Sequence, residues 1–416
     1  MKKKCIQDNF KLIKKKLTDK SAIIGIIGAG YVGSSFGKVT AKSGYRTLAF
    51  DIEKSKLEEI KALKIPLLCG ENDIAKLQVC DIIVICVGTP INDKKKPDLN
   101  AVKLSIENIA KYLRSGQLII LESTVAPGMT RRIVASKFKK NNLILGIDYF
   151  LGYSPERVDF GNSLYNIKNT PKVVAGVDEK SLDLIAFFYG RFVDQIVKMS
   201  SLEAAELCKI WENTFRFVNI NLVNQLHEYA LSIGVDIWEV IDAAATKPYG
   251  FFPFYPGPGI SGHCIPVDPY YLLDDAKRHQ FDFSILKIAM GFHKKRINKI
   301  VSKIFDICKK NNAPHILIQG IAFKKEINDI RESVGVKIYK ILKKREAKVI
   351  FNDPYVSKLG KDKSTKLSVN LLKNLDLIVI ITDHDNVDYE MIYKSGKPIL
   401  DLKNVFKNKR ENIYKI

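Results

Sequence analysis

The sequence predicts an α/β protein in which two doubly wound domains are joined by a central long-helix segment. Three observations support this fold class: a buried apolar strand that runs into a glycine-rich turn, an alternation of strands and helices near both ends, and a helical stretch between them. A chain of 416 residues also exceeds one ordinary hydrophobic core. The predicted limits are 1–20 for an N-terminal helical extension, 21–199 for the first α/β domain, 200–300 for the central segment and 301–416 for the second α/β domain.

The composition excludes several classes of protein. Apolar residues make up 46% of the chain, and no stretch approaches the ~20 apolar residues that span a bilayer. The lysine-rich start has no apolar signal core, so we expect a cytoplasmic protein. The formal charge of +22 is spread along the chain as lysines, without an arginine-rich stripe or a nucleic-acid motif. We therefore expect an anionic, phosphate-bearing substrate as partner, and neither nucleic acid nor membrane.

The seven cysteines indicate reduced thiols. No two of them form a C-x-x-C pair, and an odd, scattered set in a long chain predicts neither a disulfide framework nor a zinc site. They are Cys5, Cys69, Cys80, Cys86, Cys208, Cys264 and Cys308.

The first domain begins with a dinucleotide motif. After a helical pattern over Asn9–Asp19, Ala22–Ile27 is an apolar run fit for a buried parallel strand. It leads into Gly28-Ala29-Gly30-Tyr31-Val32-Gly33, which is G-x-G-x-x-G between that strand and a helix through Ser43. The glycines allow a tight turn, close approach of a pyrophosphate and close packing of helix on strand. The helix N-terminus offers amides to the phosphates, so a Rossmann-type domain is predicted.

A carboxylate follows the second predicted strand, Arg46–Phe50. Asp51 lies about 20 residues after the first glycine, where an acid binds the ribose hydroxyls. A carboxylate there repels a 2′-phosphate, so NAD is favoured over NADP. The alternative interpretation of Asp51 is an ordinary turn residue at a strand end.

Two further buried strands are expected at Asp81–Val87 and Gln117–Leu121. They run into the sequences Gly-Thr-Pro and Glu-Ser-Thr. Ligands bind beyond the carboxyl ends of strands in open parallel sheets. Thr89, Glu122 and Thr124 are therefore expected on the ligand-binding edge.

A long helix is expected from about Ser201, after a strand-like stretch at Lys172–Ala175. Lys209 and Asn213 are four residues apart and so lie on one face of this helix. A lysine is usually solvated, but on a helix this rich in apolar residues an inward or interface role becomes more plausible. The expected packed stripe comprises Leu207, Ile210, Trp211, Val218, Leu222 and Leu226.

The stretch from Tyr255 to Asp268 is the predicted chemical site. Its three glycines and three prolines argue against a helix or a central strand. Cys264 supplies a thiol there, beside the imidazole of His263 and near the Asp268 carboxylate. A thiolate is a strong nucleophile, and a carboxylate can accept a proton. A lone cysteine is more often a small buried apolar residue, but packing alone does not require so many glycines around one thiol.

Beyond residue 300 the alternation of strands and helices returns. The loop after the first strand carries Lys324, Lys325 and Arg331, in the place where a doubly wound sheet binds anions. This loop lacks G-x-G-x-x-G, so a diphosphate-bearing substrate is favoured over a second dinucleotide. The expected strands are His315–Gln319, Lys348–Phe351, Leu377–Ile381 and Pro398–Leu400.

From about residue 22 to its C-terminus, the chain resembles the UDP-glucose/GDP-mannose dehydrogenase family. Seven motifs in order, at compatible distances, make the resemblance specific. They are Gly28–Gly33, Val87–Pro90, Glu122–Gly128, Ser154–Val158, Ala204–Asn213, Gly262–Asp268 and Phe323–Ser333. The resemblance implies two Rossmann-like domains that bind NAD and a UDP-sugar, no metal, and a homodimer formed through the central helix.

The resemblance also implies a reaction, the four-electron oxidation of a sugar's primary alcohol to a carboxylate with reduction of two NAD. Cys264 matches the nucleophile that holds the aldehyde as a thiohemiacetal and then as a thioester. The implied catalytic residues are Cys264, Lys209, Asn213, Asp268, Thr124 and Glu156. Those implied for the cofactor are Gly28, Gly30, Tyr31, Val32, Gly33, Asp51, Thr89, Thr124 and Arg331. Those implied for the substrate are Glu156, Arg157, Val158, Lys209, Tyr255, Gly257, Gly259, Gly262 and Lys324.

The expected substrate is UDP-N-acetylglucosamine, oxidised for a surface polysaccharide. Within the family, Lys247–Gly259 with His263 and Val267 is most similar to the UDP-N-acetylglucosamine 6-dehydrogenases. Val267 and Phe160 stand where many UDP-glucose enzymes carry a lysine and a glutamate, which argues against glucose and leaves the base for hydrolysis open. UDP-N-acetylmannosamine and UDP-glucose remain alternative substrates. A non-catalytic nucleotide-sugar sensor is the alternative from another class.

Overall fold

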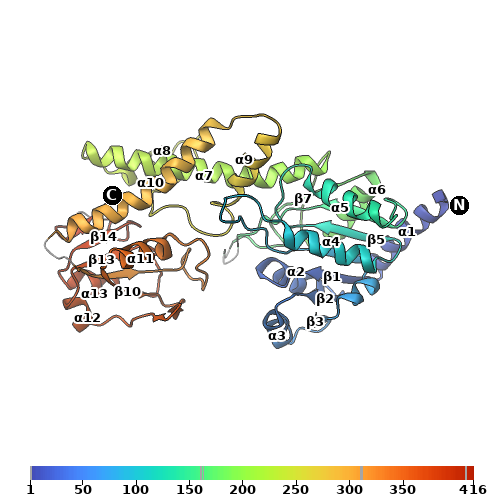
Figure 1. The fold of residues 1–416 in the computed structure, drawn as a ribbon, viewed down its shortest axis with the longest axis horizontal. Coiled ribbons are helices and arrows are strands. Elements are labelled where there is room, and N and C mark those ends of the chain that lie inside the picture. Colours follow the sequence, from blue (N-terminus) through green and yellow to red (C-terminus); the bar gives the residue numbers. More distant parts are fainter. Residues whose placement is uncertain (1, 160–161, 163, 310–312, 408–409) are drawn as a thin grey trace. The chain divides into compact units, whose positions relative to one another are not determined.

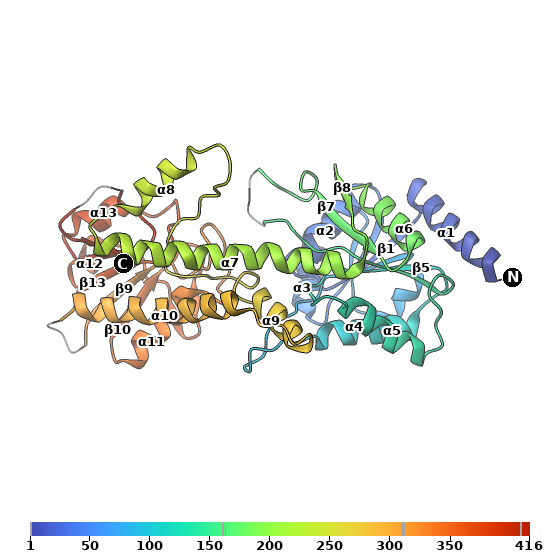
Figure 2. The ribbon, with the colours of Figure 1, turned by 90° about the horizontal axis from the view of Figure 1, so that it is seen from above.

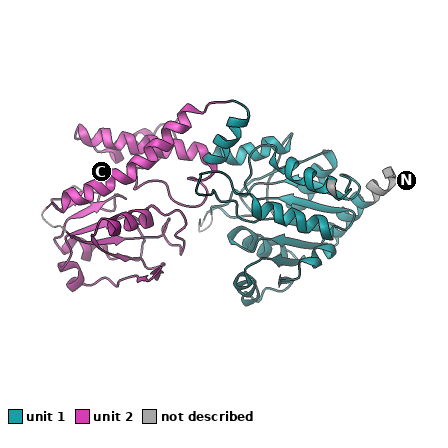
Figure 3. Ribbon diagram, in the orientation of Figure 1, with its two compact units in different colours: residues 1–212, 270–280 teal, residues 213–269, 281–416 magenta. Residues whose placement is uncertain are grey.

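The computed structural model describes residues 2–159, 162, 164–309, 313–407 and 410–416. The chain divides into two compact units, which Figure 3 shows in different colours. Unit 1 comprises residues 1–212 and 270–280, and unit 2 comprises residues 213–269 and 281–416.

Unit 1 is built on a sheet that has eight strands among the described residues, in the order β3-β2-β1-β4-β5-β6-β7-β8 (Figure 1). Its neighbouring strands are parallel except β6 and β7, which are antiparallel. The chain leaves β1 toward β2 on one side and later returns to β4 on the other, so the strand order reverses at β1, where doubly wound sheets bind ligands. The strands are β1 (Ile23–Ile27), β2 (Arg46–Phe50), β3 (Leu68–Glu71), β4 (Ile82–Ile85), β5 (Gln117–Leu121), β6 (Tyr149–Tyr153), β7 (Lys172–Gly176) and β8 (Ile196–Lys198).

Helices cover this sheet. Ile24 and Ile26 of β1 pack in one core with Phe36 of the following helix and with Phe188 and Tyr189. α4 and α5 lie side by side (Figures 1 and 2). The helices are α1 (Lys2–Thr18), α2 (Tyr31–Lys42), α3 (Lys54–Ala62), α4 (Asn100–Tyr112), α5 (Met129–Lys140) and α6 (Glu179–Tyr189), with a 3-10 helix η1 at Ile74–Val79.

The predicted N-terminal helix is α1, and it forms part of the core of unit 1. Ile13 and Leu17 are buried in the same apolar cluster as β1. The Tyr45 hydroxyl donates to the carbonyl oxygen of Leu17 at 2.7 Å, and the Lys16 ammonium lies 2.7 Å from the Asp81 carboxylate. The helical spacing of Ile13 and Leu17 in the sequence therefore corresponds to a face of α1 that packs on the core of unit 1.

Unit 2 contains a second parallel sheet, with the order β10-β9-β13-β14-β15. Alternate residues of β9 pack on opposite faces: Ile316 and Ile318 on one face with Ile338 of α11, and Leu317 on the other face with Leu372 of α12. The strands are β9 (His315–Gln319), β10 (Lys348–Asn352), β13 (Leu377–Ile380), β14 (Ile399–Asp401) and β15 (Ile413–Tyr414), with a hairpin of β11 (Lys358–Leu359) and β12 (Asp362–Lys363). The helices are α8 (Ile237–Ala245), α10 (Ser284–Ile307), α11 (Val334–Lys344), α12 (Val369–Lys373) and α13 (Tyr389–Lys394).

Two helices contribute residues to both units: α7 (Leu202–Ser232) and α9 (Asp268–Arg278). In unit 2, α10 runs beside the later part of α7 (Figure 2), where the Arg296 guanidinium lies 3.3 Å from the Glu228 carboxylate. Among the described residues, no helix has the length and apolar character needed to cross a membrane.

The predicted packed stripe on α7 is wrong. Of its six members only Ile210 is buried, whereas Trp211 and Leu222 are 57% and 60% exposed and Leu207 and Leu226 are 43% exposed. The buried face of α7 instead carries many polar side chains: Glu206, Asn213, Thr214, Asn221, Asn224 and His227. Three of these polar side chains hold neighbouring segments: Glu206 accepts the N–H groups of Gly128 and Thr130, Asn213 bonds to Asp268, and Asn224 bonds to Gly257. The apolar stripe is left on the outside of the single chain.

The strand predictions agree closely with the structure. Arg46–Phe50, Gln117–Leu121 and His315–Gln319 have the predicted bounds. The predicted strand over Asp81–Val87 is shortened to Ile82–Ile85, since its residue pairing with β1 and β5 ends at Ile85.

Candidate active site

The glycine turn after β1 has the geometry of a dinucleotide site. Gly28 has φ of +98°, which favours glycine, and a Cβ at Gly33 would lie only 1.9 Å from the carbonyl oxygen of Gly28. A Cβ at Gly30 would meet no atom within 4 Å, so the space in front of the turn is open for a ligand. Tyr31 and Val32 begin α2, whose N-terminal amides face that space.

Asp51 lies beside this turn. One of its carboxylate oxygens accepts the backbone N–H of Ala29 at 2.7 Å, and the other accepts that of Glu53 at 2.9 Å. The carboxylate is therefore fixed at the end of β2, as a ribose-binding acid requires. Thr89 and Thr124 follow β4 and β5 on the same edge of the sheet, and the carbonyl oxygen of Thr89 accepts the Tyr271 hydroxyl at 2.8 Å.

The predicted thiol lies in a turn that leads into a helix. Cys264 is half-buried, and its carbonyl oxygen accepts the backbone N–H groups of Val267 and Asp268 at 3.0 and 2.9 Å. These bonds form the entry to α9, whose N-terminus favours negative charge nearby. Residues 255–267 contain neither helix nor strand, as the sequence predicts.

Asn213 and Asp268 meet in unit 2. The Asn213 amide donates to the Asp268 carboxylate at 2.5 Å, and both side chains are buried. Since Asp268 is also bonded through its backbone to Cys264, three of the predicted catalytic residues come together within this unit. Lys209 lies one helical turn before Asn213 on α7 and is half-buried.

The predicted substrate loop is held by polar groups of the surrounding helices. The backbone N–H of Gly257 donates to Asn224 at 2.9 Å, and its carbonyl oxygen accepts from Arg296 at 3.0 Å. The Tyr255 hydroxyl donates to Asp242 at 2.7 Å. Asn224 and Arg296, which hold this loop, were not identified from the sequence.

The thiol turn also packs on the loop after β9. Gly259 and Gly262 have φ of +136° and +93°, and a Cβ at Gly262 would lie 3.1 Å from the Phe323 ring. The Ser261 hydroxyl accepts the backbone N–H of Val334, the first residue of α11, at 2.9 Å. The loop that carries Cys264 and the loop after β9, which carries Lys324, thus pack together in unit 2.

In unit 1, the Glu156 carboxylate accepts hydrogen bonds from two backbone N–H groups and lies beside one ammonium group. One oxygen accepts the backbone N–H groups of Arg157 and Val158 at 2.8 and 2.7 Å, and the other lies 3.2 Å from the Lys172 ammonium. Arg157 is itself engaged by Glu212, at 2.6 Å.

Lys172 was not singled out from the sequence, but it lies at the centre of a buried polar network. Its buried ammonium lies 2.9 Å from Glu122 as well as 3.2 Å from Glu156, so it bridges two carboxylates. The Tyr189 hydroxyl donates to Glu122 at 2.5 Å, and the Cys86 thiol donates to it at 3.3 Å. A lysine at the start of the apolar stretch Lys-Val-Val-Ala was the one signal in the sequence that could have revealed this network.

Lys325 and Arg331, two basic residues of the loop after β9, each pair with an acidic residue of unit 2. Lys325 lies 2.9 Å from Asp385, and the Arg331 guanidinium binds the Asp329 carboxylate at 2.6 Å. Lys324 lies in the same loop and is half-buried. The predicted roles of Lys324 and Arg331 stay predictions, and Phe160 lies outside the described residues.

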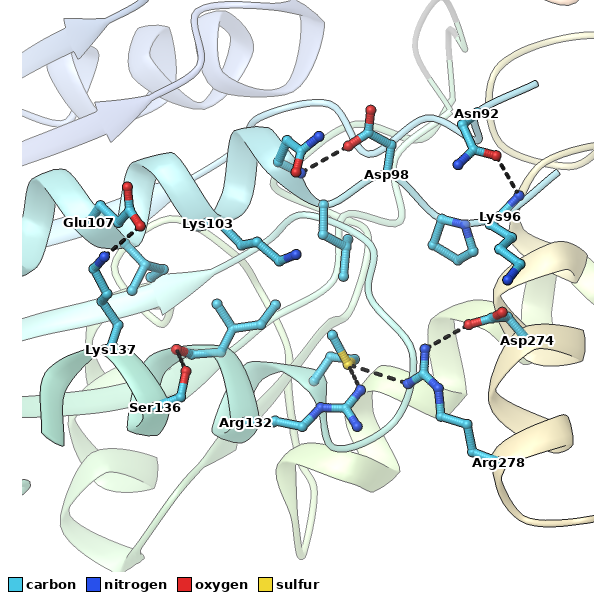
Figure 4. Close-up of a pocket in the computed structure, with 16 residues that line it drawn as sticks. Asn92, Lys96, Asp98, Lys103, Glu107, Arg132, Ser136, Lys137, Asp274 and Arg278 are labelled. Atoms are coloured by element: carbon cyan, nitrogen blue, oxygen red, sulfur yellow. Dashed lines mark hydrogen bonds and ion pairs between the residues drawn. The ribbon is translucent and has the colours of Figure 1, made fainter. Parts of the chain in front are cut away.

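A separate hollow of about 1020 Å³ in unit 1 (Figure 4) contains none of the predicted site residues. It is formed by the loop before α4 together with α4, α5 and α9. Arg132 and Arg278 both donate to the sulfur of Met129, and Lys103 points into the space. Among the described residues, no group of three or more histidine, cysteine or acidic side chains could hold a metal ion.

The parallel sheet of unit 1, with its glycine turn after β1, is a dinucleotide-binding fold of the Rossmann type. Sequence models of the UDP-glucose/GDP-mannose dehydrogenase family match the chain in three places: the NAD binding domain at residues 22–193, the central domain at 203–294 and the UDP binding domain at 317–408. The chain therefore belongs to the UDP-glucose/GDP-mannose dehydrogenase family and is an NAD-dependent UDP-sugar dehydrogenase.

Individual relatives differ in the sugar that their names specify. The chain is 31% identical over 410 residues to a UDP-N-acetyl-D-mannosamine dehydrogenase of Pyrococcus horikoshii, which covers 92% of this chain and 96% of the relative. It is also 31% identical over 361 residues to a UDP-N-acetyl-D-glucosamine 6-dehydrogenase of Pseudomonas aeruginosa, covering 81% and 84%. A solved structure of a UDP-D-ManNAc dehydrogenase from Pyrococcus horikoshii superposes with a TM-score of 0.86 at 29% identity, covering 94% of this chain and 98% of the other.

Proposed function

We propose that this dehydrogenase oxidises the primary alcohol of a UDP-N-acetylhexosamine, most specifically UDP-N-acetylglucosamine, to the uronate through a covalent adduct on Cys264. The observation that carries the proposal is the half-buried Cys264 at the entry to α9. Its backbone carbonyl oxygen accepts the Asp268 N–H, and the Asp268 carboxylate accepts the Asn213 amide. A protein that only sensed nucleotide-sugars would need no nucleophile, and this argues against the sensor.

The thiol is needed for the second oxidation. The first oxidation converts the alcohol to an aldehyde, whose trigonal carbon must become tetrahedral before it can lose a second hydride. Addition of the Cys264 sulfur makes that carbon tetrahedral as a thiohemiacetal, with the thiol proton passing to the former carbonyl oxygen. Loss of hydride from the carbon and of the proton from the hydroxyl group then leaves a thioester, and water cleaves its C–S bond to give the carboxylate and the free thiol. Bound NAD supplies the hydride acceptor for each oxidation.

The other predicted residues support these steps. Lys209 and Asn213 offer a cation and an amide donor to the oxyanion that forms at the sugar carbon. Asp268 and Thr124 are proposed to handle the proton and water, and Glu156 to act in thioester hydrolysis.

NAD fits the open turn at Gly30 and the fixed Asp51 carboxylate in unit 1, with Arg331 as a further proposed contact. Lys324 and the loop from Tyr255 to Gly262 are proposed to hold the UDP-sugar.

The identity of the sugar is the open part of the proposal. The sequence Lys247–Gly259, with Val267 after the thiol, supports UDP-N-acetylglucosamine. The relative from Pyrococcus horikoshii favours UDP-N-acetylmannosamine as the second candidate. UDP-glucose is the less favoured substrate, because Val267 stands where many of its enzymes carry a lysine.

The oligomeric state, the cellular location and the biosynthetic role of the protein are also proposed. A cytoplasmic homodimer formed through α7 would cover its exposed apolar stripe, since an exposed apolar patch of this kind marks an interaction site. A role in surface polysaccharide synthesis follows from the uronate product. The proposed functional segments are 1–20, 21–199 for NAD, 200–300 for dimerisation and catalysis, and 301–416 for the UDP-sugar.

One assay tests the proposal. The purified protein is incubated with NAD and each of UDP-glucose, UDP-N-acetylglucosamine and UDP-N-acetylmannosamine, and the NADH formed is counted per sugar consumed. We expect two NADH per molecule of UDP-N-acetylglucosamine and slower turnover of the others. Preferred turnover of the manno sugar would select the second candidate, and no NADH with any of the three would contradict the proposal.

A further inference from the structure

We infer that Lys172 is a positioning residue for the hydrolytic step: its ammonium, shared between Glu122 and Glu156, holds the Glu156 carboxylate in place as an anion. This inference rests on the proposed function, since it assigns to Lys172 an effect on the step in which Glu156 is proposed to act.

The topology of unit 1 explains why a lysine reaches this place. Parallel strands bring only their carboxyl ends to the ligand-binding edge, and Glu122 follows the end of β5 there. β7 is antiparallel to β6, with Tyr153 opposite Ala175. The first residue of β7, Lys172, therefore lies at the same edge as Glu156, which follows the end of β6.

The three charged groups form a compact buried bridge. The side chains of Lys172, Glu122 and Glu156 are only 8%, 1% and 13% exposed. The ammonium is 2.9 Å from Glu122 and 3.2 Å from Glu156, and it also donates to the carbonyl oxygen of Pro155 at 3.2 Å. Its three N–H donors thus have three partners, so the side chain has a fixed direction.

Groups from β7, from α7 and from its own loop favour the anionic form of Glu156. Lys172 approaches from β7, the backbone N–H groups of Arg157 and Val158 donate from its own loop, and Lys209 of α7 adds a further positive charge. On the far side of the ammonium, the Tyr189 hydroxyl of α6 and the Cys86 thiol after β4 both donate to Glu122.

The pKa values of the two bridged groups move apart. Burial by itself raises the pKa of Glu156, but Lys172, the Val158 N–H and Lys209 outweigh burial and hold that pKa below its ordinary value. Burial by itself lowers the pKa of Lys172, but Glu122 and Glu156 outweigh it and hold that pKa above its ordinary value. Lys172 therefore stays charged. Glu156 stays ionised to a lower pH than a carboxyl group that was buried without these partners.

Stability alone is a weak explanation for this arrangement. A buried ion pair gains little net stability, because the cost of removing its charges from water offsets their attraction. A fixed carboxylate at the ligand-binding edge is useful to hydrolysis, since an ionised carboxylate can accept the proton that water loses when it attacks the thioester carbon.

The test measures the rate of uronate formation against pH for the full-length protein and three variants. Replacing the cation, in Lys172→Met, should move the acidic limb of the rate profile to higher pH by about one unit or more, because one counter-charge of Glu156 is lost. A covalent adduct on Cys264 should also accumulate and be visible by mass spectrometry after acid quenching. Lys172→Arg should largely restore the profile.

Glu122→Gln should shift the acidic limb of the rate profile in the opposite direction to Lys172→Met, which a merely structural role of Lys172 would not produce. Without the competing carboxylate, the ammonium acts on Glu156 alone, so the acidic limb should move to lower pH by a few tenths of a unit. If Lys172→Met does not fold, the direction of this shift decides the question. Acidic limbs that stay in place, or that move the same way in both variants, overturn the inference. Absence of uronate from the unmodified protein would contradict the proposed function instead.

Discussion

The two sheets begin in the same way and then diverge at one turn. Gly28 after β1 and Gly320 after β9 both have positive φ, at +98° and +81°, and each is followed by a glycine whose Cβ would face its carbonyl oxygen. Five positions separate Gly28 from Gly33, whereas fifteen separate Gly320 from Gly335. The longer turn carries Lys324 and packs on the thiol loop through Phe323.

This difference suits the two turns to the two kinds of anion site that we propose. The short turn brings backbone amides close to a pyrophosphate, so glycine is the key residue there. The long turn offers side-chain cations for the proposed substrate and packs on the Cys264 loop. Substitutions in each turn test whether the short turn binds NAD and the long turn binds the UDP-sugar.

The largest effect is expected from Gly33→Ala. The added methyl group would lie 1.9 Å from the Gly28 carbonyl oxygen, so helix and strand must separate at a cost of roughly 3 kcal/mol or more in the free energy of unfolding. Urea unfolding measures this cost. In the matched Gly335→Ala variant the closest contact is 3.3 Å, so the loss should be about 1 kcal/mol or less. Equal losses would remove the distinction between the two turns.

Gly30→Ala should separate binding from folding. A methyl group there meets no protein atom within 4 Å, so the free energy of unfolding should be unchanged. The methyl would occupy the space through which the pyrophosphate approaches, so NAD affinity should fall by at least about tenfold. Isothermal titration with NAD and with UDP measures both sites, and UDP affinity should stay constant. Unchanged NAD affinity would show that the cofactor does not approach this turn.

Lys324→Ala should have the converse effect on the long turn. Loss of a cation that binds a diphosphate should weaken UDP-sugar binding by about tenfold, with NAD binding unaffected. Lys325→Ala is the matched control, because that ammonium is already neutralised by Asp385 at 2.9 Å and should matter little. If Lys325→Ala weakens UDP-sugar binding more than Lys324→Ala, the substrate contact is made by Lys325 and the role proposed for Lys324 is wrong.

The smallest effect is expected from Asp51→Ala. Its carboxylate is fixed by two backbone N–H groups and should bind the ribose hydroxyls, so NAD affinity should fall a few-fold. NADP affinity should fall less or rise, because the repulsion of its 2′-phosphate is removed. The ratio of the two affinities is the measurement, and an unchanged ratio argues against the ribose contact.

Much of the fold could be predicted because its signals are local. The apolar strands, the glycine turn and the proline-rich loop each depend on residues that are close in sequence, and β2, β5 and β9 have the predicted bounds. The resemblance to the family supplied the catalytic assignments, and the structure brings Cys264, Asn213 and Asp268 together.

What could not be predicted depends on contacts between distant parts of the chain. The apolar stripe on α7 has helical spacing, but spacing does not reveal which neighbour covers it, and Asn224 and Asn213 turn the polar face inward by holding loops. Lys172 was overlooked because its position depends on the antiparallel direction of β7, which the strand pattern alone does not specify.

The most direct test of the central claim is the number of hydrides that leave each sugar in the unmodified protein and in Cys264→Ser. With the preferred UDP-sugar, the unmodified protein should form two NADH and one uronate per sugar, whereas the serine variant should form no uronate and at most one NADH, since its weaker nucleophile cannot carry the second oxidation. A serine variant that makes uronate at the unmodified rate, with two NADH per sugar, would contradict the role of the thiol and with it the proposed mechanism.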